Sequence, residues 1–121
     1  MDPKDNELAL KNASLLTVGE ALLFYSAVLG LTRTNVTVRA LLDCGASHTF
    51  ISSTVAKRLD GLVVRRYGEP LAVGMADGNK LYTNTSIRIP ITLGSWRGYV
   101  EAWILELPGY DFILGRDFLR S

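Results

Sequence analysis

The chain has 121 residues, of which 48% are hydrophobic and 21% are charged, and this composition indicates one folded domain and excludes a disordered or collagen-like chain. Thirteen basic and twelve acidic residues give a formal net charge of +1, which is not typical of a surface that binds nucleic acid or anionic membranes. One cysteine and one histidine exclude an internal disulfide and a structural zinc site.

The N-terminal segment carries no sign of a targeting or membrane sequence. It begins with acidic and polar residues, and no window of the chain has the length and hydrophobicity of a membrane-spanning helix. We therefore expect an intracellular, cytoplasmic protein with no membrane and no nucleic-acid partner. Residues 1–20 mix charges and leucines without a clean period, so we expect an N-terminal arm or leader there and a folded domain over 21–121.

The first predicted elements are a hairpin and a short helix. Residues 22–30 and 35–43 are rich in aromatic and β-branched side chains, which favours two strands joined by a short connection. Ser52 or Ser53 is a candidate N-cap for the helix that follows. Val55 and Leu59 lie four residues apart on its apolar face, and Gly61 is expected to end it.

Strands dominate the rest of the chain. Residues 62–64 and 70–75 are strand-like, and an Asp-Gly pair predicts a tight hairpin over 75–80. Apolar and polar side chains alternate over 85–95, which indicates a half-buried strand in which Pro90 favours an edge position. Residues 97–107 and 112–114 are further strands, and a helical turn follows Gly115. About seven strands and one or two short helices predict a mostly-β domain.

Asp43 ends a run of apolar residues in the segment ALLDCGASHTFIS and raises two interpretations. In the first, Asp43 opens an ordinary turn, in which its carboxylate accepts backbone hydrogen bonds and Gly45 allows an unusual backbone conformation. In the second, the carboxylate at the end of a strand is a catalytic acid or base, because such groups work best on rigid and partly desolvated supports.

A second motif, FILGRDFL at residues 112–119, favours the catalytic interpretation. Together with LLDCGASHTFIS and the central VGMADGNKL segment, it resembles the retropepsin-like aspartic proteases, especially those of Gypsy-class LTR retrotransposons. The resemblance extends from Leu22 to Leu119. It implies an all-β fold, a retropepsin-like closed β-barrel or sandwich that carries half of an active site, with a flap hairpin and one or two short helices.

The resemblance also implies a homodimer, because the chain has a single Asp-x-Gly triplet and the family's chemistry needs two carboxylates. Aspartic proteases are the standard example of two carboxylates that share one proton. One member activates a water and the other stabilises the oxyanion, so no metal or organic cofactor is needed. The expected substrate is an extended peptide or polyprotein of a retroelement, cleaved within the retroelement particle.

The family pattern assigns roles to individual residues of this chain. Asp43 is the expected catalytic residue, and the active-site loop continues through Cys44, Gly45 and Ala46, of which the last two would lie beside the substrate backbone. The expected flap, which would contact substrate, consists of Met75, Ala76, Asp77, Gly78 and Asn79. The residues of the second motif that are expected to support the loop are Ile113, Leu114 and Gly115.

Two positions depart from the family pattern. Cys44 stands where the family has Thr or Ser, and a thiol donates a weaker hydrogen bond across a dimer. Ser47 stands where many retroviral relatives have an acidic residue, so Arg116 is expected to pair instead with Asp117, Asp111 or Asp60. The single histidine, His48, is interpreted as a satisfied loop residue rather than as the partner of a nucleophilic Cys44.

Alternative functions remain open at this level. The domain could belong to a host gene derived from such an element, or to a ubiquitin-linked shuttle protease, although the sequence contains no ubiquitin-like segment. It could also be a catalytically weak or inactive dimerisation or peptide-binding module, an interpretation that Cys44 favours.

Overall fold

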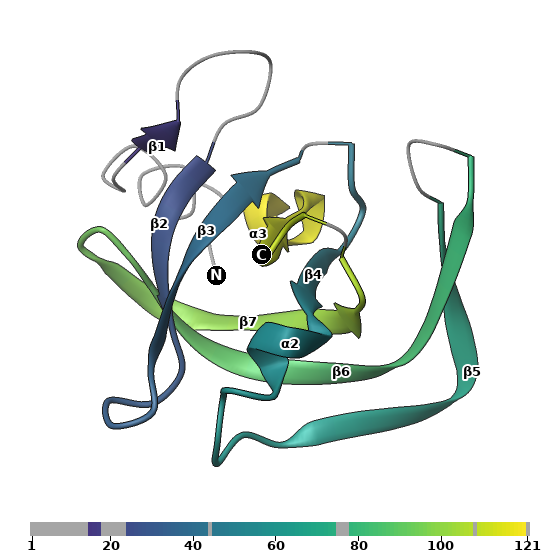
Figure 1. The fold of residues 1–121 in the computed structure, drawn as a ribbon, viewed down its shortest axis with the longest axis horizontal. Coiled ribbons are helices and arrows are strands. Elements are labelled where there is room, and N and C mark those ends of the chain that lie inside the picture. The colour runs from purple at the N-terminus through teal and green to yellow at the C-terminus, as the bar shows by residue number, and fades with distance from the viewer. Residues whose placement is uncertain (1–14, 18–23, 44, 75–77, 108, 121) are drawn as a thin grey trace.

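The computed structural model describes residues 15–17, 24–43, 45–74, 78–107 and 109–120. Eight strands and two short helices are found in this part of the chain (Figure 1). Their bounds are β1 Leu15–Thr17, β2 Phe24–Leu29, β3 Val36–Leu42, β4 Thr49–Ser52, α2 Ser53–Ala56, β5 Val64–Gly74, β6 Lys80–Leu93, β7 Trp96–Leu105, β8 Phe112–Leu114 and α3 Arg116–Arg120.

The strands form one sheet that curls into a closed barrel. Their order is β1-β2-β3-β8-β4-β7-β6-β5, and a further pairing of β2 with β6 joins the two sides, so that β2, β3, β8, β4, β7 and β6 make a six-stranded barrel. Most neighbours are antiparallel, but β3 pairs with β8 and β4 pairs with β7 in parallel. The expected all-β, retropepsin-like closed barrel is confirmed.

The barrel interior is filled by side chains that alternate along the strands. In β6, Ile87, Ile89, Ile91 and Leu93 are at most 2% exposed, whereas Arg88 between them points to solvent. The same alternation places every second residue of β3 in this core. A strand with one buried face requires alternation with a period of two, so the alternating residues predicted the inward face of β6 correctly.

Helix α2 follows the predicted capping chemistry. Ser52 is the N-cap, and its hydroxyl accepts a hydrogen bond from the backbone N–H of Val55 at 3.1 Å. Val55 and Leu59 are both buried against the barrel core, although the helix itself ends at Ala56. Gly61 adopts φ = 79°, a conformation that favours glycine, but the expectation that it ends the helix is wrong, because the helix ends at Ala56.

The strand-like segments predicted at 62–64 and 70–75 overlap with one continuous strand, β5, which begins only at Val64 and ends at Gly74. Its pairing with β6 shifts between Arg66 and Leu71, so an irregularity separates two regular stretches of the same strand. The irregularity contains Gly68 and Pro70, which interrupt the alternation of apolar and polar residues, so the sequence pattern did not indicate one continuous strand. With Lys80–Leu93 as its second strand, the β5–β6 hairpin extends to one side of the barrel (Figure 1).

The expectation that Pro90 marks an edge strand is wrong. Strand β6 pairs with β7 through Pro90 and Tyr99, and with β2 from Ile91 onward. The carbonyl of Pro90 accepts a hydrogen bond from the backbone N–H of Gly30 at 2.9 Å. Pro90 therefore lies where β6 enters its contact with β2, a position at which the proline lacks a donor but still supplies an acceptor.

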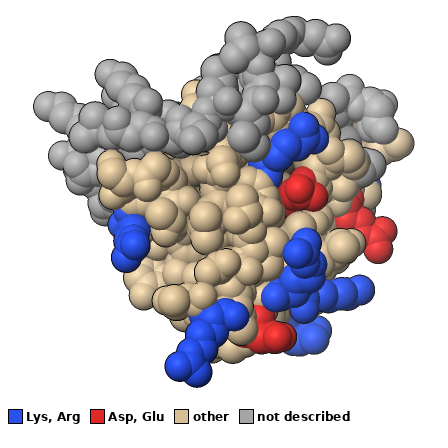
Figure 2. Space-filling model, turned by 60° about the vertical axis from the view of Figure 1, so that its left-hand side comes forward, with Lys and Arg blue, Asp and Glu red and all other residues tan. Residues whose placement is uncertain are grey.

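The charged side chains are distributed over the surface. On the face shown in Figure 2, Lys and Arg lie in separate groups with acidic side chains among them. The single ion pair within the described residues joins Arg65 to Glu101 at 3.7 Å. In the same residues, no helix has the length and apolar character that crossing a membrane demands.

Candidate active site

Asp43 lies directly after β3, at the point where β3 and β8 run side by side. Its backbone N–H donates to the carbonyl of Leu114 at 3.0 Å, which extends the parallel pairing of the two strands by one bond. Its own carbonyl accepts from Ala46 N–H at 3.1 Å, and its Oδ1 accepts from Gly45 N–H at 2.9 Å. The carboxylate is thus held at a defined position by the backbone of its own loop.

A glycine allows the Asp43 loop to pack against the start of α3. Arg116 N–H donates to the carbonyl of Ala46 at 2.8 Å. A Cβ atom at Gly115 would lie 2.1 Å from the carbonyl oxygen of His48 and 2.9 Å from that of Ala46, so no other residue fits without a backbone shift. Gly115 therefore occupies the supporting position that the sequence predicts, and the reason is the close approach of two backbones.

A polar network between β4 and α3 completes this support. The hydroxyl of Thr49, which is fully buried, donates to Asp117 Oδ1 at 2.8 Å and accepts from Gly115 N–H at 3.2 Å. Asp117 also accepts from the backbone N–H groups of Thr49, at 3.2 Å, and Phe118, at 2.8 Å. These bonds connect the segment that follows the Asp43 loop to helix α3, although Thr49 and Asp117 are 68 residues apart in the sequence.

Thr49→Val is expected to lower the free energy of unfolding by about 1–3 kcal/mol, because it leaves the buried N–H of Gly115 without its partner and removes one of the two donors to Asp117 Oδ1. Chemical denaturation measures the change. Thr37→Val is the matched control, since Thr37 is exposed on β3, and its effect should stay below about 0.5 kcal/mol. Equal effects in the two variants would show that the network contributes nothing to stability.

Arg116 does not form the ion pair that the sequence predicts. Its side chain is exposed, and neither Asp117, Asp111 nor Asp60 pairs with it in the described part of the chain. Asp117 is engaged by the hydroxyl and backbone donors described above, so its oxygens already have partners. The prediction failed because it treated the acidic residue as a charge partner, whereas the fold uses it as a hydrogen-bond acceptor.

The Asp43 cleft is a cavity of about 690 Å³ that opens beside the carboxylate. One wall comes from the Asp43 loop and the strands near it, and the other comes from the end of β5. Apolar side chains and glycines make up most of the lining. The lining residues are Leu41, Asp43, Gly45, Ala46, Ser47, His48, Phe50, Ala72, Val73, Gly74, Leu105, Leu107, Tyr110 and Ile113.

The structure separates the predicted supporting residues by role. Ile113 is half-buried and lines the cleft, whereas Leu114 is fully buried in the barrel core and supports Asp43 only through its carbonyl. Gly78 and Asn79 are exposed at the β5–β6 connection, where Gly78 adopts φ = 88°. The other predicted flap residues, Met75, Ala76 and Asp77, lie outside the described residues, and so does Cys44.

Sequence reasoning missed most of the apolar wall of the cleft. Phe50, Leu105 and Leu107 form a small buried cluster apart from the barrel core, with Val73 and Tyr110 packed against it. A signal was present, because β4 and β7 carry large apolar residues on both faces, which a strand with one solvent face does not need. The alternation alone could not say what covers the second face.

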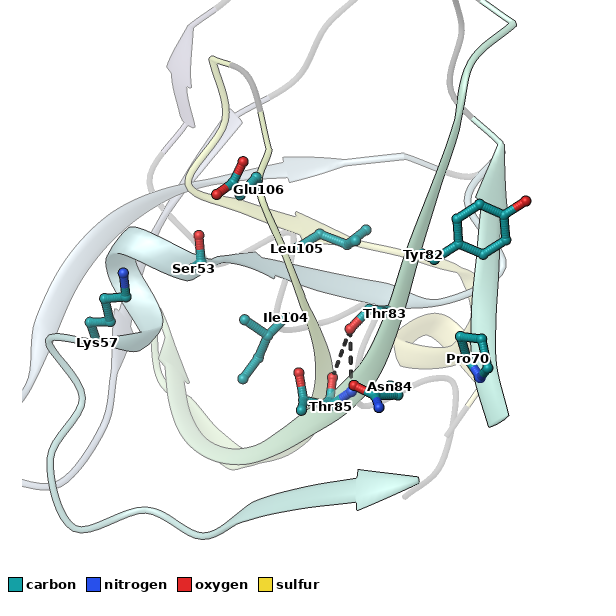
Figure 3. Close-up of a pocket in the computed structure, with 10 residues that line it drawn as sticks. All are labelled: Ser53, Lys57, Pro70, Tyr82, Thr83, Asn84, Thr85, Ile104, Leu105 and Glu106. Carbon is teal, nitrogen blue, oxygen red and sulfur yellow. Dashed lines mark hydrogen bonds between the residues drawn. The ribbon is translucent and has the colours of Figure 1, made fainter. Parts of the chain in front are cut away.

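A second cavity, of about 500 Å³, lies where β6 and β7 diverge near α2 (Figure 3). Lys57, Tyr82 and Glu106 are among its lining residues. The hydroxyl of Thr83 points to its own strand, where it donates to the carbonyl of Thr85 and accepts from the N–H of Thr85, both at 3.3 Å. This cavity contains none of the predicted site residues.

The described residues also contain no group of three or more histidine, cysteine or acidic side chains that could hold a metal ion. The chemical groups that the cleft provides are therefore the Asp43 carboxylate, the hydroxyls of Ser47 and Tyr110, and the imidazole of His48. A carboxylate on a rigid loop beside an apolar groove can act as a general acid or base towards a bound substrate.

The closed barrel and the strand-end aspartate define a retroviral-protease-like domain. The structure resembles EIAV protease in complex with the inhibitor HBY-793, with a TM-score of 0.65 and 22% identity over 86% of this chain and 91% of that one. It also resembles the retroviral protease-like domain of Ddi1 from Leishmania major, with a TM-score of 0.60 and 22% identity over 84% of this chain and 77% of that one. At these identities the likeness concerns the fold.

Residues 31–121 match the family described as "gag-polyprotein putative aspartyl protease", and the chain belongs to this family. The matched range includes the Asp43 loop, the β5–β6 hairpin and α3. No curated protein matches the chain in sequence. The expected retropepsin-like aspartic protease domain is confirmed, and the narrower assignment to a Gypsy-class retrotransposon stays a prediction.

Proposed function

We propose that this protein is an aspartic endopeptidase that acts as a homodimer on a retroelement polyprotein. The observation that carries the proposal is the placement of Asp43, which ends a core strand, is held by Gly45 N–H at 2.9 Å and lines an apolar cleft. The match to a gag-polyprotein protease family supports the substrate class.

The homodimer follows from the number of carboxylates. Asp43 is the single acidic side chain among the described residues that line the cleft of one chain, whereas peptide hydrolysis by this chemistry needs an ionised carboxylate and a protonated one. Two copies of the Asp43 loop, related by a two-fold axis, supply both. Two carboxyl groups that share one site cannot both be ionised, because their negative charges repel each other. The pair therefore holds one proton between them and titrates as a unit.

In the proposed mechanism, the ionised carboxylate takes a proton from a water molecule as that water attacks the scissile carbonyl. The protonated carboxylate donates to the developing oxyanion and later supplies the proton that the leaving amine requires. The bond between Gly45 N–H and Asp43 Oδ1 keeps the carboxylate oriented while protons move. No cofactor takes part in this scheme.

The substrate is proposed to bind as an extended strand between the Asp43 loop and the β5–β6 hairpin. Val73 and Gly74 at the end of β5 face the cleft from the side opposite Ala46 and Ile113, so a peptide between them contacts both walls. Extended peptides gain affinity from main-chain hydrogen bonds to exposed strands and gain specificity from pockets for alternate side chains. The apolar lining favours substrates with large apolar side chains.

Specific activity is expected to rise with enzyme concentration, because an isolated chain has only half of the proposed site. Rates per chain should increase over the range in which sedimentation shows monomers converting to dimers, and should level off where dimers dominate. The measurement compares initial rates over a dilution series with sedimentation velocity on the same samples. A rate per chain that stays constant through that conversion contradicts the dimeric site.

The proposed activity is tested with a peptide library at about pH 5, with and without a statine-type inhibitor that mimics the tetrahedral intermediate. We expect cleavage between apolar residues that the inhibitor abolishes. Cleavage that the inhibitor leaves unchanged contradicts the aspartic mechanism. Peptide binding without any cleavage would instead support the alternative of an inactive peptide-binding module, which the Ddi1-type fold also accommodates.

A further inference from the structure

Among the described residues that line the Asp43 cleft, His48 is the only one whose side chain can carry a positive charge. The other polar side chains of the lining are those of Asp43, Ser47 and Tyr110, and the remaining lining residues are apolar or glycine. A cationic group in an apolar groove favours substrates with an acidic side chain, because an uncharged or basic side chain forms no ion pair with it.

The imidazole of His48 is held in place on several sides. Its Nδ1 lies 2.8 Å from the hydroxyl of Ser47. The ring makes edge-to-face contacts with Phe50, at a centroid distance of 6.4 Å, and with Trp103, at 6.2 Å. Its backbone is fixed by the close approach of Gly115. A ring fixed in this way loses little conformational freedom when it binds a ligand.

The second nitrogen of the ring, Nε2, accepts or donates no hydrogen bond within the part of the chain that the structure describes. In the same residues, no carboxylate forms an ion pair with His48. The acidic side chains nearby have other partners. Asp117 accepts from Thr49 and from the backbone of α3. Glu101 accepts from the hydroxyl of Ser86 at 2.7 Å and forms an ion pair with Arg65.

The remaining charged and titratable groups near His48 are Asp43, which ends the strand before the same loop, Arg116 and two tyrosines. Arg116 is exposed, and the ring of Tyr67 packs against Trp103 at an interplanar angle of 42°, with its hydroxyl 3.2 Å from that of Ser86. Tyr110 is the other titratable group of the cleft lining. Asp43 belongs to the proposed catalytic pair. A carboxylate of the substrate is therefore the group that can accept a hydrogen bond from Nε2.

We infer that His48 is a specificity-determining residue that binds an acidic side chain of the peptide substrate, which deepens the proposed function and rests on it. The ring donates from Nε2 to the substrate carboxylate while the hydroxyl of Ser47 engages Nδ1. The preferred substrates are therefore apolar peptides with one Glu or Asp in the segment that contacts His48.

The experiment uses pairs of apolar peptides that differ only by Glu against Gln at one position, and this position is scanned along the peptide at pH 5. Cleavage is measured as kcat/KM, and binding of the same intact peptides is measured with the Asp43→Asn protein. At one position we expect the Glu peptide to be favoured about 10-fold or more in both measurements, as for a hydrogen bond to a charged group.

His48→Gln is the test variant, because it keeps a polar side chain and removes the charge. The Glu-to-Gln ratio should fall to about one in both measurements. Arg97→Gln is the matched control, since it removes an exposed positive charge of β7 that is not part of the cleft, and its ratio should stay as in the parent.

The outcomes separate this inference from the proposed function. Cleavage without preference for Glu, or a preference that survives in His48→Gln, overturns the role of His48 and leaves the protease intact. Absence of cleavage, together with a binding preference for Glu that His48→Gln removes, supports the role of His48 and contradicts the protease. Absence of both cleavage and preference overturns both.

Discussion

Asp43→Asn is expected to lower kcat/KM by about 10⁴-fold or more, because it removes the group that takes the proton from the attacking water. The fold should survive, since the asparagine side chain has the same shape and its amide oxygen can accept the bond from Gly45 N–H that Oδ1 accepts now. Initial rates on a cleaved peptide measure the first effect, and chemical denaturation measures the second.

Asp60→Asn is the matched control for this prediction. Asp60 is exposed, and its backbone carbonyl lies 3.4 Å from the hydroxyl of Thr34. Thr34 precedes β3, so Asp60 lies near the end of that strand opposite Asp43. This control should keep the parent activity and stability. Turnover by Asp43→Asn at the parent rate would remove Asp43 from the chemistry, whereas loss of the folded state would mean that its carboxylate is needed for stability.

Gly115→Ala is expected to have the largest effect on stability. The added Cβ would lie 2.1 Å from the carbonyl oxygen of His48 and 2.6 Å from its carbon, which are backbone atoms that no change of rotamer can move. Overpacking in a well-packed site costs about 1–3 kcal/mol, and relief here requires a shift of the Asp43 loop, so we expect about 3 kcal/mol or more. Activity should be lost with the geometry of that loop.

Gly68→Ala provides the comparison for Gly115→Ala. Gly68 lies in β5 with no atom within 4 Å of an added Cβ and without a positive φ, so the same substitution meets open space there. Its unfolding free energy should stay within about 0.5 kcal/mol of the parent. A Gly115→Ala protein as stable as Gly68→Ala would show that the Asp43 loop and α3 do not pack as closely as the structure has them.

The elements that sequence predicted well are those whose signals are local. The hydroxyl of Ser52 caps α2 by accepting a hydrogen bond from the N–H of Val55, three residues along the chain, and the apolar side chain of Val55 is buried as the sequence predicts. The alternation along β6 likewise identified its core face. In each case the residues that carry the signal are neighbours in the same element, so no long-range contact was needed to interpret them.

The elements of the site that sequence missed depend on contacts between distant segments. Thr49 and Asp117 are 68 residues apart, and only the meeting of β4 with α3 shows that the aspartate accepts from Thr49 rather than from Arg116. The motif marked Gly115 as important, but the cause is the carbonyl of His48. The wall of Phe50 and Leu105 emerges only when β4 and β7 pair in parallel.

The central claim is that two Asp43 carboxylates from two chains make one site, and mixed dimers test it most directly. Parent protein is unfolded with a ninefold excess of Asp43→Asn protein, refolded with it and assayed for peptide cleavage. Random pairing leaves about one tenth of the parent chains in parent dimers, so activity per parent chain should fall to about one tenth. Refolding with Asp60→Asn should cause no loss. Activity per parent chain that is unaffected by the Asp43→Asn excess would contradict the shared site.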